Sequence, residues 1–136
     1  MLRPMSRLAT DRLDGRPVEP ADAEVLARLF GDPATAALAA AAGRPWDADR
    51  ARAGAAAQAA HWTAHRFGLR LWSDAEGPAA LAGLQFCVID GRAEVEASFA
   101  VMPGRRGRGY AREALAAALA EGPDIASEIA AVVKRE

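Results

Sequence analysis

The sequence predicts an α+β domain in which a mostly antiparallel sheet packs against helices. Three observations support this class. Apolar residues recur at helical spacing through residues 20–64, alternate as in strands through residues 67–101, and return to helical spacing after a loop rich in glycine and arginine. The 136 residues are enough for one hydrophobic core, and no repeat or low-complexity linker divides them. We therefore expect a single domain spanning residues 1–136.

Composition excludes several protein classes. Hydrophobic residues make up 51% of the chain and the formal net charge is −1, which is typical of a globular protein and not of a disordered or generally basic one. No stretch resembles a signal peptide or the roughly 20 apolar residues of a membrane span. The single cysteine, Cys87, cannot form an internal disulfide and lies in an apolar strand pattern, so we expect a small core side chain and a cytoplasmic location.

The first quarter of the chain predicts a strand and a helix. A short strand is expected within residues 8–18, interrupted by Gly15 and ended by Pro17. Pro20 is suited to the first turn of a helix, and Gly31 is suited to its end. The strand should therefore lead directly into the helix.

Two further helical segments are expected before the sheet. Asp32 and Pro33 start an alanine-rich segment that ends at Gly43, and Asp47 caps a longer helix that runs to about Ala64. Three tryptophans are expected in the core rather than in a stacking platform for a ligand: Trp46, Trp62 and Trp72.

Three strands follow, over residues 67–72, 80–89 and 94–101. The pair Asp90–Gly91 indicates a tight hairpin, and the short connections predict antiparallel pairing. One face of the middle strand is apolar, which fits a sheet that lies against helices; its residues are Leu84, Phe86 and Val88.

The stretch after the last of these strands predicts an anion site. Glycines 104, 107 and 109 lack Cβ atoms and allow positive φ, so successive N–H groups can face one ligand. The helix that starts near Tyr110 or Ala111 and stops at Gly122–Pro123 adds unpaired first-turn N–H groups and its dipole. Four arginines, at positions 105, 106, 108 and 112, add charge. A phosphate-bearing ligand is expected, and neither the Walker loop nor the dinucleotide fingerprint fits the order of these residues.

This loop resembles a signature of a known superfamily. The run Arg106, Gly107, Arg108, Gly109, Tyr110 and Ala111 is similar to the Arg/Gln-x-x-Gly-x-Gly/Ala motif of the GCN5-related N-acetyltransferase (GNAT) superfamily. Residues 10–23 and 46–69 also resemble its ribosomal-protein-alanine N-acetyltransferase branch, so the resemblance covers nearly the whole chain. It implies an α/β/α fold with a mixed, mostly antiparallel sheet and helices on both faces.

The resemblance also implies a cofactor and a reaction. In the family the loop holds the pyrophosphate of acetyl-CoA, and the preceding strand pairs with the pantetheine through its backbone. The implied acetyl-CoA contacts are Phe99, Ala100, Val101, Arg106, Gly107, Arg108, Gly109, Tyr110 and Ala111. A primary amine, on a protein N-terminus or a small molecule, would attack the acetyl carbonyl directly in a ternary complex. No metal is implied.

Glu96 is the candidate general base, because related enzymes often place a strand carboxylate there. Period two puts Glu94, Glu96 and Ser98 on one face of their strand, and Ser98 is the second candidate. A solvated charge or a salt bridge is the alternative reading of Glu96. Tyr110 could act as an acid, but packing in support of the loop is favoured.

Metal and nucleic-acid sites are not expected. His61 and His65 have helical i, i+4 spacing but lack an accompanying Glu or Cys cluster. The arginines are confined to one loop and lack interleaved aromatic residues.

The C-terminal segment departs from the family pattern. Residues 129–133 are expected to form a strand parallel to the one that ends at Val101, although their spacing also suits a helix. The family's next helix and last two strands do not follow, so we expect an incomplete sheet with an open edge. Three readings stay open: a truncated N-acetyltransferase, a homodimer or complex completed through that edge, and a non-catalytic module that binds CoA or another protein.

Overall fold

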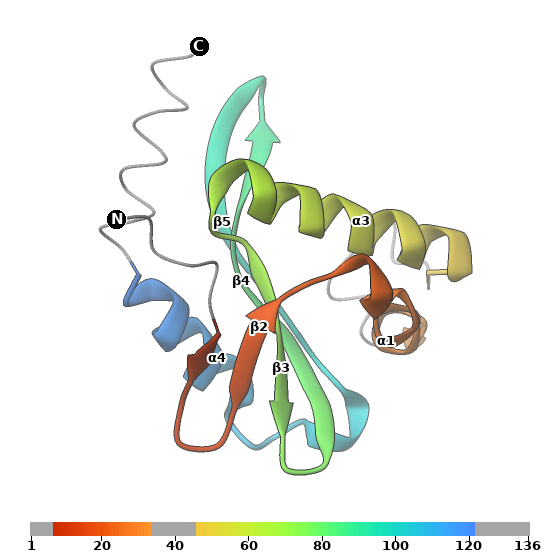
Figure 1. Ribbon diagram of the computed structural model, residues 1–136, viewed down its shortest axis with the longest axis vertical. Helices are drawn as coiled ribbons and strands as arrows, with labels where there is room; N and C mark the ends of the chain where they lie inside the picture. Colours follow the sequence, from red (N-terminus) through yellow and green to blue (C-terminus); the bar gives the residue numbers. More distant parts are fainter. Residues whose placement is uncertain (1–6, 34–45, 122–136) are drawn as a thin grey trace.

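The computed structural model describes residues 7–33 and 46–121, which form one antiparallel sheet flanked by helices (Figure 1). The sheet has the order β1-β2-β3-β4-β5. Its strands are β1 (Leu8–Ala9), β2 (Asp14–Pro17), β3 (Leu69–Asp74), β4 (Gly77–Ile89) and β5 (Arg92–Val101). The helices are α1 (Ala23–Phe30), α3 (Ala48–His65) and α4 (Tyr110–Leu119), with short 3-10 turns η1 (Pro20–Asp22) and η2 (Pro103–Arg105).

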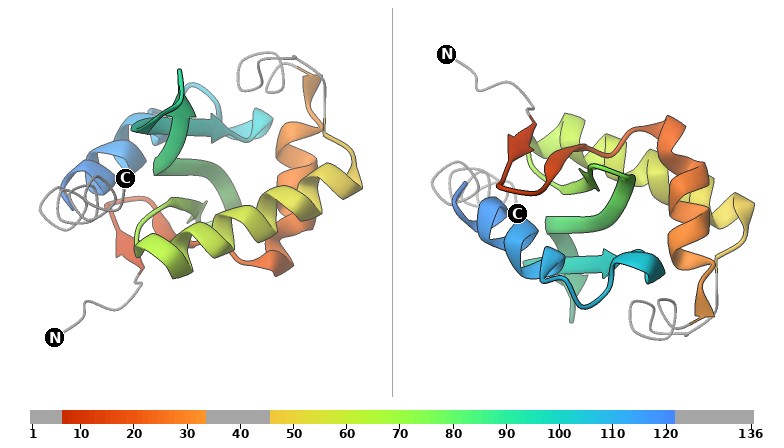
Figure 2. Two further views of the ribbon diagram at one scale, coloured as in Figure 1. Left: turned by 90° about the horizontal axis from the view of Figure 1, so that it is seen from above. Right: turned by 90° about the horizontal axis from the view of Figure 1, so that it is seen from below.

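Helices cover both faces of the sheet. Figure 2 shows α1 and α3 on one side and α4 on the other. Alternating strand residues divide accordingly: Leu69 and Leu81 belong to the core beneath α1 and α3, whereas Trp72, Ala80 and Ala82 belong to the core beneath α4. The expected α+β class with helices on both faces is confirmed.

Several predictions concern residues outside the described part of the chain. They are the alanine-rich segment that ends at Gly43, the helix stop at Gly122–Pro123 and the parallel strand at residues 129–133. All neighbouring strands within the described sheet pair antiparallel. In this part of the chain no helix is both long and apolar enough to cross a bilayer.

The prediction of one short N-terminal strand broken at Gly15 is wrong. The segment forms two strands, β1 and β2, and Gly15 lies inside β2 opposite Trp72. A Cβ atom at Gly15 would lie 2.6 Å from the Trp72 ring, so the glycine makes room for the indole. The glycine indicates close packing against Trp72, and not the end of a strand.

The two helices on the first face begin and end as the sequence predicts. Pro20 lies in the η1 turn that leads into α1, and Gly31 is the residue at which α1 ends. Asp47 caps α3, because its Oδ1 atom accepts a hydrogen bond of 2.8 Å from the Arg50 N–H. Trp62 and Trp72 are buried core residues as expected, whereas Trp46 is only partly buried.

The β4–β5 hairpin positions the candidate base. Its turn residues Asp90 and Gly91 have φ of 52° and 76°, the left-handed values that a tight hairpin requires. Its register places Gln85 opposite Glu96. Cys87, opposite Glu94, is partly exposed and lies outside the core, which corrects the expectation of a core side chain.

Candidate functional site

The glycine–arginine loop joins η2 to α4 in the geometry expected of an anion site. Gly107 and Gly109 have φ of 80° and 78°, which strongly favours glycine, whereas Gly104 has no positive φ. Gly109 is the N-cap of α4. The first N–H groups of this helix therefore point out of its N-terminus without helical partners, and they carry the positive end of its dipole.

Asp74, at the end of β3, holds this loop from below. Its Oδ2 atom accepts hydrogen bonds from Arg105 Nε at 3.2 Å and from the Tyr110 hydroxyl at 3.1 Å. Arg105 Nη2 also donates to Asp74 Oδ1 at 3.3 Å, and Arg108 Nη1 lies 3.8 Å from Oδ2. The Arg105 guanidinium is the main reason that the pKa of Asp74 falls from 3.8 to about 2. Both ends of the loop are thus tied to one carboxylate.

The arginines of the loop divide into one buried anchor and two more exposed cations. The Arg105 side chain is largely buried against Asp74. Arg106 and Arg108 are more exposed, although Arg106 Nη2 donates to Asp32 Oδ2 at 2.9 Å. Arg106 and Arg108 therefore can reach a bound phosphate, whereas Arg105 fixes the loop.

The turn between β1 and β2 supports α4. Glu113 accepts hydrogen bonds from the Thr10 hydroxyl and from Arg12, whose Nε lies 2.8 Å from Glu113 Oε1. These contacts, led by the Thr10 hydrogen bond, lower the pKa of Glu113. The Arg12 guanidinium also lies over the Tyr110 ring at 4.7 Å. The N-terminus of α4 is thus held by the β1–β2 turn as well as by Asp74.

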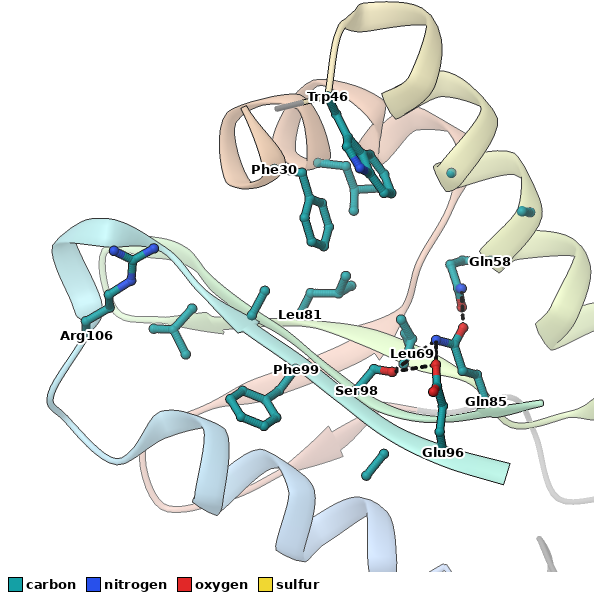
Figure 3. Close-up of a pocket in the computed structure, with 16 residues that line it drawn as sticks. Phe30, Trp46, Gln58, Leu69, Leu81, Gln85, Glu96, Ser98, Phe99 and Arg106 are labelled. Carbon is teal, nitrogen blue, oxygen red and sulfur yellow. Dashed lines mark hydrogen bonds between the residues drawn. The ribbon is translucent and has the colours of Figure 1, made fainter. Parts of the chain in front are cut away.

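A cavity of about 690 Å³ lies between the sheet and helices α1 and α3 (Figure 3). This is the size of a small-molecule site. Apolar side chains line most of it, including Leu26, Phe30, Trp46, Leu69 and Leu81. Arg106 lies at one end and Glu96 at the other, so the cavity connects the loop with the candidate base.

Four polar side chains form a hydrogen-bonded chain at the Glu96 end. Gln58 Nε2 donates to Gln85 Oε1 at 2.7 Å, and Gln85 Nε2 donates to Glu96 Oε1 at 3.1 Å and to Ser98 Oγ at 3.0 Å. Ser98 Oγ also lies 3.3 Å from Glu96 Oε1.

A carboxylate only accepts hydrogen bonds, so Gln85 turns its amino group toward Glu96 and its oxygen toward Gln58. Within the described residues, Gln58 Oε1 is then left buried without a donor. The Glu96 carboxylate therefore sets the orientation of both amide side chains.

The comparisons with known proteins agree with this geometry. The sequence profile of the acetyltransferase (GNAT) domain matches residues 12–134. This chain belongs to the GNAT acetyltransferase family. A search of the curated proteins finds no match.

Solved structures share the fold of this GNAT domain. A protein from Bordetella pertussis, described as of the GnaT acetyltransferase family, is 27% identical with a TM-score of 0.72, over 87% of this chain and 72% of that one. An acetyltransferase from Agrobacterium tumefaciens is 22% identical with a TM-score of 0.69, over 89% of this chain and 68% of its own. A GNAT-family acetyltransferase from Bacillus anthracis is 19% identical with a TM-score of 0.64, over 86% and 66%.

The residues predicted for the site in this GNAT domain differ in the direction of their side chains. Glu96 and Ser98 line the cavity together, as their shared strand face predicts. Phe99 points away from the cavity toward α4 and is 58% exposed (Figure 3). The backbone of β5 therefore lies between the cavity and the side of the sheet that α4 covers.

Tyr110 is buried beneath the loop, where its hydroxyl donates to Asp74. This packing supports the loop, in line with the favoured reading of that residue. His61 serves the fold: its Nε2 accepts from the Phe86 N–H at 3.0 Å and its Nδ1 lies 2.8 Å from the Phe67 carbonyl oxygen. Together with His65 it packs against Phe67 and Phe86.

Sequence reasoning missed the residues that position the site. Asp74 anchors the loop, and Gln58 and Gln85 lead to Glu96, yet none of the three belongs to a sequence motif. Gln85 could have been found from the hairpin register, because counting back from Asp90–Gly91 places it opposite Glu96. Asp74 and Gln58 come from elements whose contacts appear only once the chain is folded.

Proposed function

We propose that this chain is an acetyl-CoA-dependent N-acetyltransferase that acetylates a primary amine by direct attack in a ternary complex. The observation that carries the proposal is the meeting of two features at Arg106: a glycine–arginine loop at the N-terminus of α4, and a ligand-sized cavity with Glu96 at its far end. The loop suits the pyrophosphate, and the cavity suits the acceptor.

The cofactor contacts follow from the loop. Gly107, Arg108 and Gly109, with the first N–H groups of Tyr110 and Ala111, would bind the pyrophosphate. Arg106 would add its charge at the junction with the cavity. The backbone of Phe99, Ala100 and Val101 would pair with pantetheine and polarise the thioester carbonyl, as in the family.

Glu96 would act as the general base. It would take a proton from the ammonium group of the acceptor, after which the neutral nitrogen forms the C–N bond and the C–S bond breaks. CoA leaves as the thiolate, which takes up the second proton from the nitrogen. Gln85 and Ser98 would orient the Glu96 carboxylate through their hydrogen bonds.

The acceptor amine is either on a protein N-terminus, as in the ribosomal-protein-alanine branch that the sequence resembles, or on a small molecule. A cytoplasmic location is part of the same proposal, because the single cysteine, Cys87, cannot form an internal disulfide.

The test compares two glutamates on the same face of β5. The purified chain is mixed with acetyl-CoA and an amine, and both the released CoA thiol and the mass of the acetylated product are measured. We expect Glu96→Gln to lower kcat by about 10²-fold or more, because it removes the base. Glu94→Gln is the matched control, since both glutamates are exposed but only Glu96 lines the cavity. Equal activity of the two variants would remove Glu96 from the mechanism, and no transfer to any amine would refute the proposed activity.

A further inference from the structure

The cavity has two chemically different ends, and together they restrict the acceptor. The end formed by β4 and β5 carries Glu96, Ser98 and Gln85. The end beneath α1 is apolar and aromatic, with Phe30 and Trp46 as its largest side chains (Figure 3). A ligand that fills the cavity must therefore join a polar group to an apolar body.

The aromatic end is a fixed surface. The Phe30 and Trp46 rings stack with centroids 4.3 Å apart and an interplanar angle of 25°. The Trp46 N–H donates to the Phe30 carbonyl oxygen at 2.9 Å, which holds the two residues together through their backbones. On α3, a Cβ atom at Gly54 would lie 2.6 Å from the Trp46 ring, so the absence of a side chain there lets the indole lie against the helix. A ligand meets a surface whose position is already set.

The charged residues in the cavity lining also limit how many positive charges a ligand can carry. Among the described residues that line the cavity, only Glu96 and Arg106 carry a charge, and Arg106 is hydrogen-bonded to Asp32. One ammonium group can pair with Glu96. A second ammonium group would lie against Leu26, Leu69 or Leu81, where an unpaired charge costs several kcal/mol.

The polar end also disfavours a peptide. Its side chains already bond to one another, from Gln58 through Gln85 to Glu96 and Ser98. The N–H and C=O groups of a peptide would need hydrogen-bond partners that the apolar lining does not supply. A compact amine has a single polar group to satisfy, and Glu96 satisfies it.

We propose that the acceptor is a small primary amine with one positive charge and a compact aromatic body. This inference rests on the proposed N-acetyltransferase function. The ammonium group binds at Glu96 and loses its proton there, and the ring packs against Phe30 and Trp46. The nitrogen then forms the amide bond as the thioester C–S bond breaks, and the departing CoA thiolate takes up the second proton from the nitrogen.

A panel of amines tests this class. Phenethylamine is compared with ethylamine, which lacks the ring; with phenylalanine, which adds a carboxylate; with spermidine, which adds charges; and with a pentapeptide that begins with alanine. We expect kcat/KM for phenethylamine to exceed that for ethylamine by about 30-fold or more, because the phenyl ring is buried. The other three should fall below phenethylamine by about 10-fold or more. Preference for spermidine, phenylalanine or the peptide would overturn the inference.

Two variants of Trp46 test whether the preference for phenethylamine over ethylamine depends on the aromatic surface. Trp46→Ala should reduce the ratio of kcat/KM between phenethylamine and ethylamine about 10-fold, whereas Trp46→Phe, which keeps a ring, should retain most of it. Calorimetric binding of acetyl-CoA verifies that each variant is folded. An unchanged ratio in Trp46→Ala would contradict the placement of the ring.

Direct calorimetric titration with phenethylamine separates the two proposals. Binding that is weakened by Trp46→Ala, without any acetyl transfer, would support the ligand class and refute the enzymatic activity. Acetyl transfer without preference for the aromatic amine would refute the ligand class alone. Absence of both binding and transfer would overturn this inference as well as the proposed function.

Discussion

Replacing Asp74 by asparagine should destabilise the protein by an amount that depends on pH. The side chain is buried beneath the loop, where it accepts hydrogen bonds from Arg105 and Tyr110. Asparagine keeps the shape and one acceptor but removes the charge. The difference between the ordinary pKa of 3.8 and the value of about 2 in the folded protein corresponds to about 2 kcal/mol.

The sign of the pH dependence follows from the direction of the shift. A carboxyl group whose pKa is lowered by folding stabilises the folded state fully above its unfolded pKa, and this stabilisation is lost as pH falls through the folded value. The free energy of unfolding of the wild type should therefore exceed that of Asp74→Asn by about 2 kcal/mol at pH 7. The gap should shrink as pH falls from about 4 to 2.

Urea denaturation followed by tryptophan fluorescence measures both quantities. Glu76→Gln is the matched control, because Glu76 lies 3.5 Å from the same Arg105 but its side chain is 69% exposed. An exposed pair of this kind contributes less than about 1 kcal/mol. If Asp74→Asn costs no more than Glu76→Gln, or if the gap stays constant down to pH 2, Asp74 does not anchor the loop.

Two further predictions concern hydrogen bonds between side chains. Glu121→Ala should lower the free energy of unfolding by about 3 kcal/mol in thermal or urea denaturation. It removes the carboxylate that accepts a hydrogen bond of 2.6 Å from Arg70 Nη1, and the Arg70 side chain is only 1% exposed. A cost below about 1 kcal/mol would show that the burial of Arg70 does not depend on Glu121. Gln85→Leu should lower kcat about 10-fold in steady-state assays, with the KM for acetyl-CoA unchanged, because it removes the donor to Glu96. Gln58→Leu removes only the donor to Gln85 and should have a smaller effect on kcat. Equal effects of the two leucine variants would contradict the role given to Gln85.

Local patterns were enough to predict most of the elements. Residues that set backbone geometry gave reliable boundaries: Asp47 as a cap, Gly31 as a stop and Asp90–Gly91 as a hairpin turn. The strand period also placed Glu96 and Ser98 correctly on one face. These features depend on neighbours within a few positions, so they can be read without the fold.

The errors come from contacts between distant parts of the chain. Gly15 could not be understood without the Trp72 ring, which lies 57 positions away in the sequence. Trp46 was expected in the core, but the structure places it in the wall of the cavity against Phe30. Asp74 reads as an ordinary turn residue until Arg105 and Tyr110 are folded against it. Residues that position a site through tertiary contacts leave little local signal.

The most direct test of the account is calorimetric titration of the chain with acetyl-CoA, comparing Gly109→Trp with Gly91→Trp. Both glycines have left-handed backbone, with φ of 78° and 76°, so the two substitutions impose similar backbone strain. Gly91 lies in the β4–β5 turn, whereas Gly109 caps α4 within the loop. We predict saturable binding to the wild type and to Gly91→Trp, and loss of binding in Gly109→Trp. Equal binding by both variants, or no binding by the folded wild-type chain, would contradict the assignment of the loop as the acetyl-CoA site.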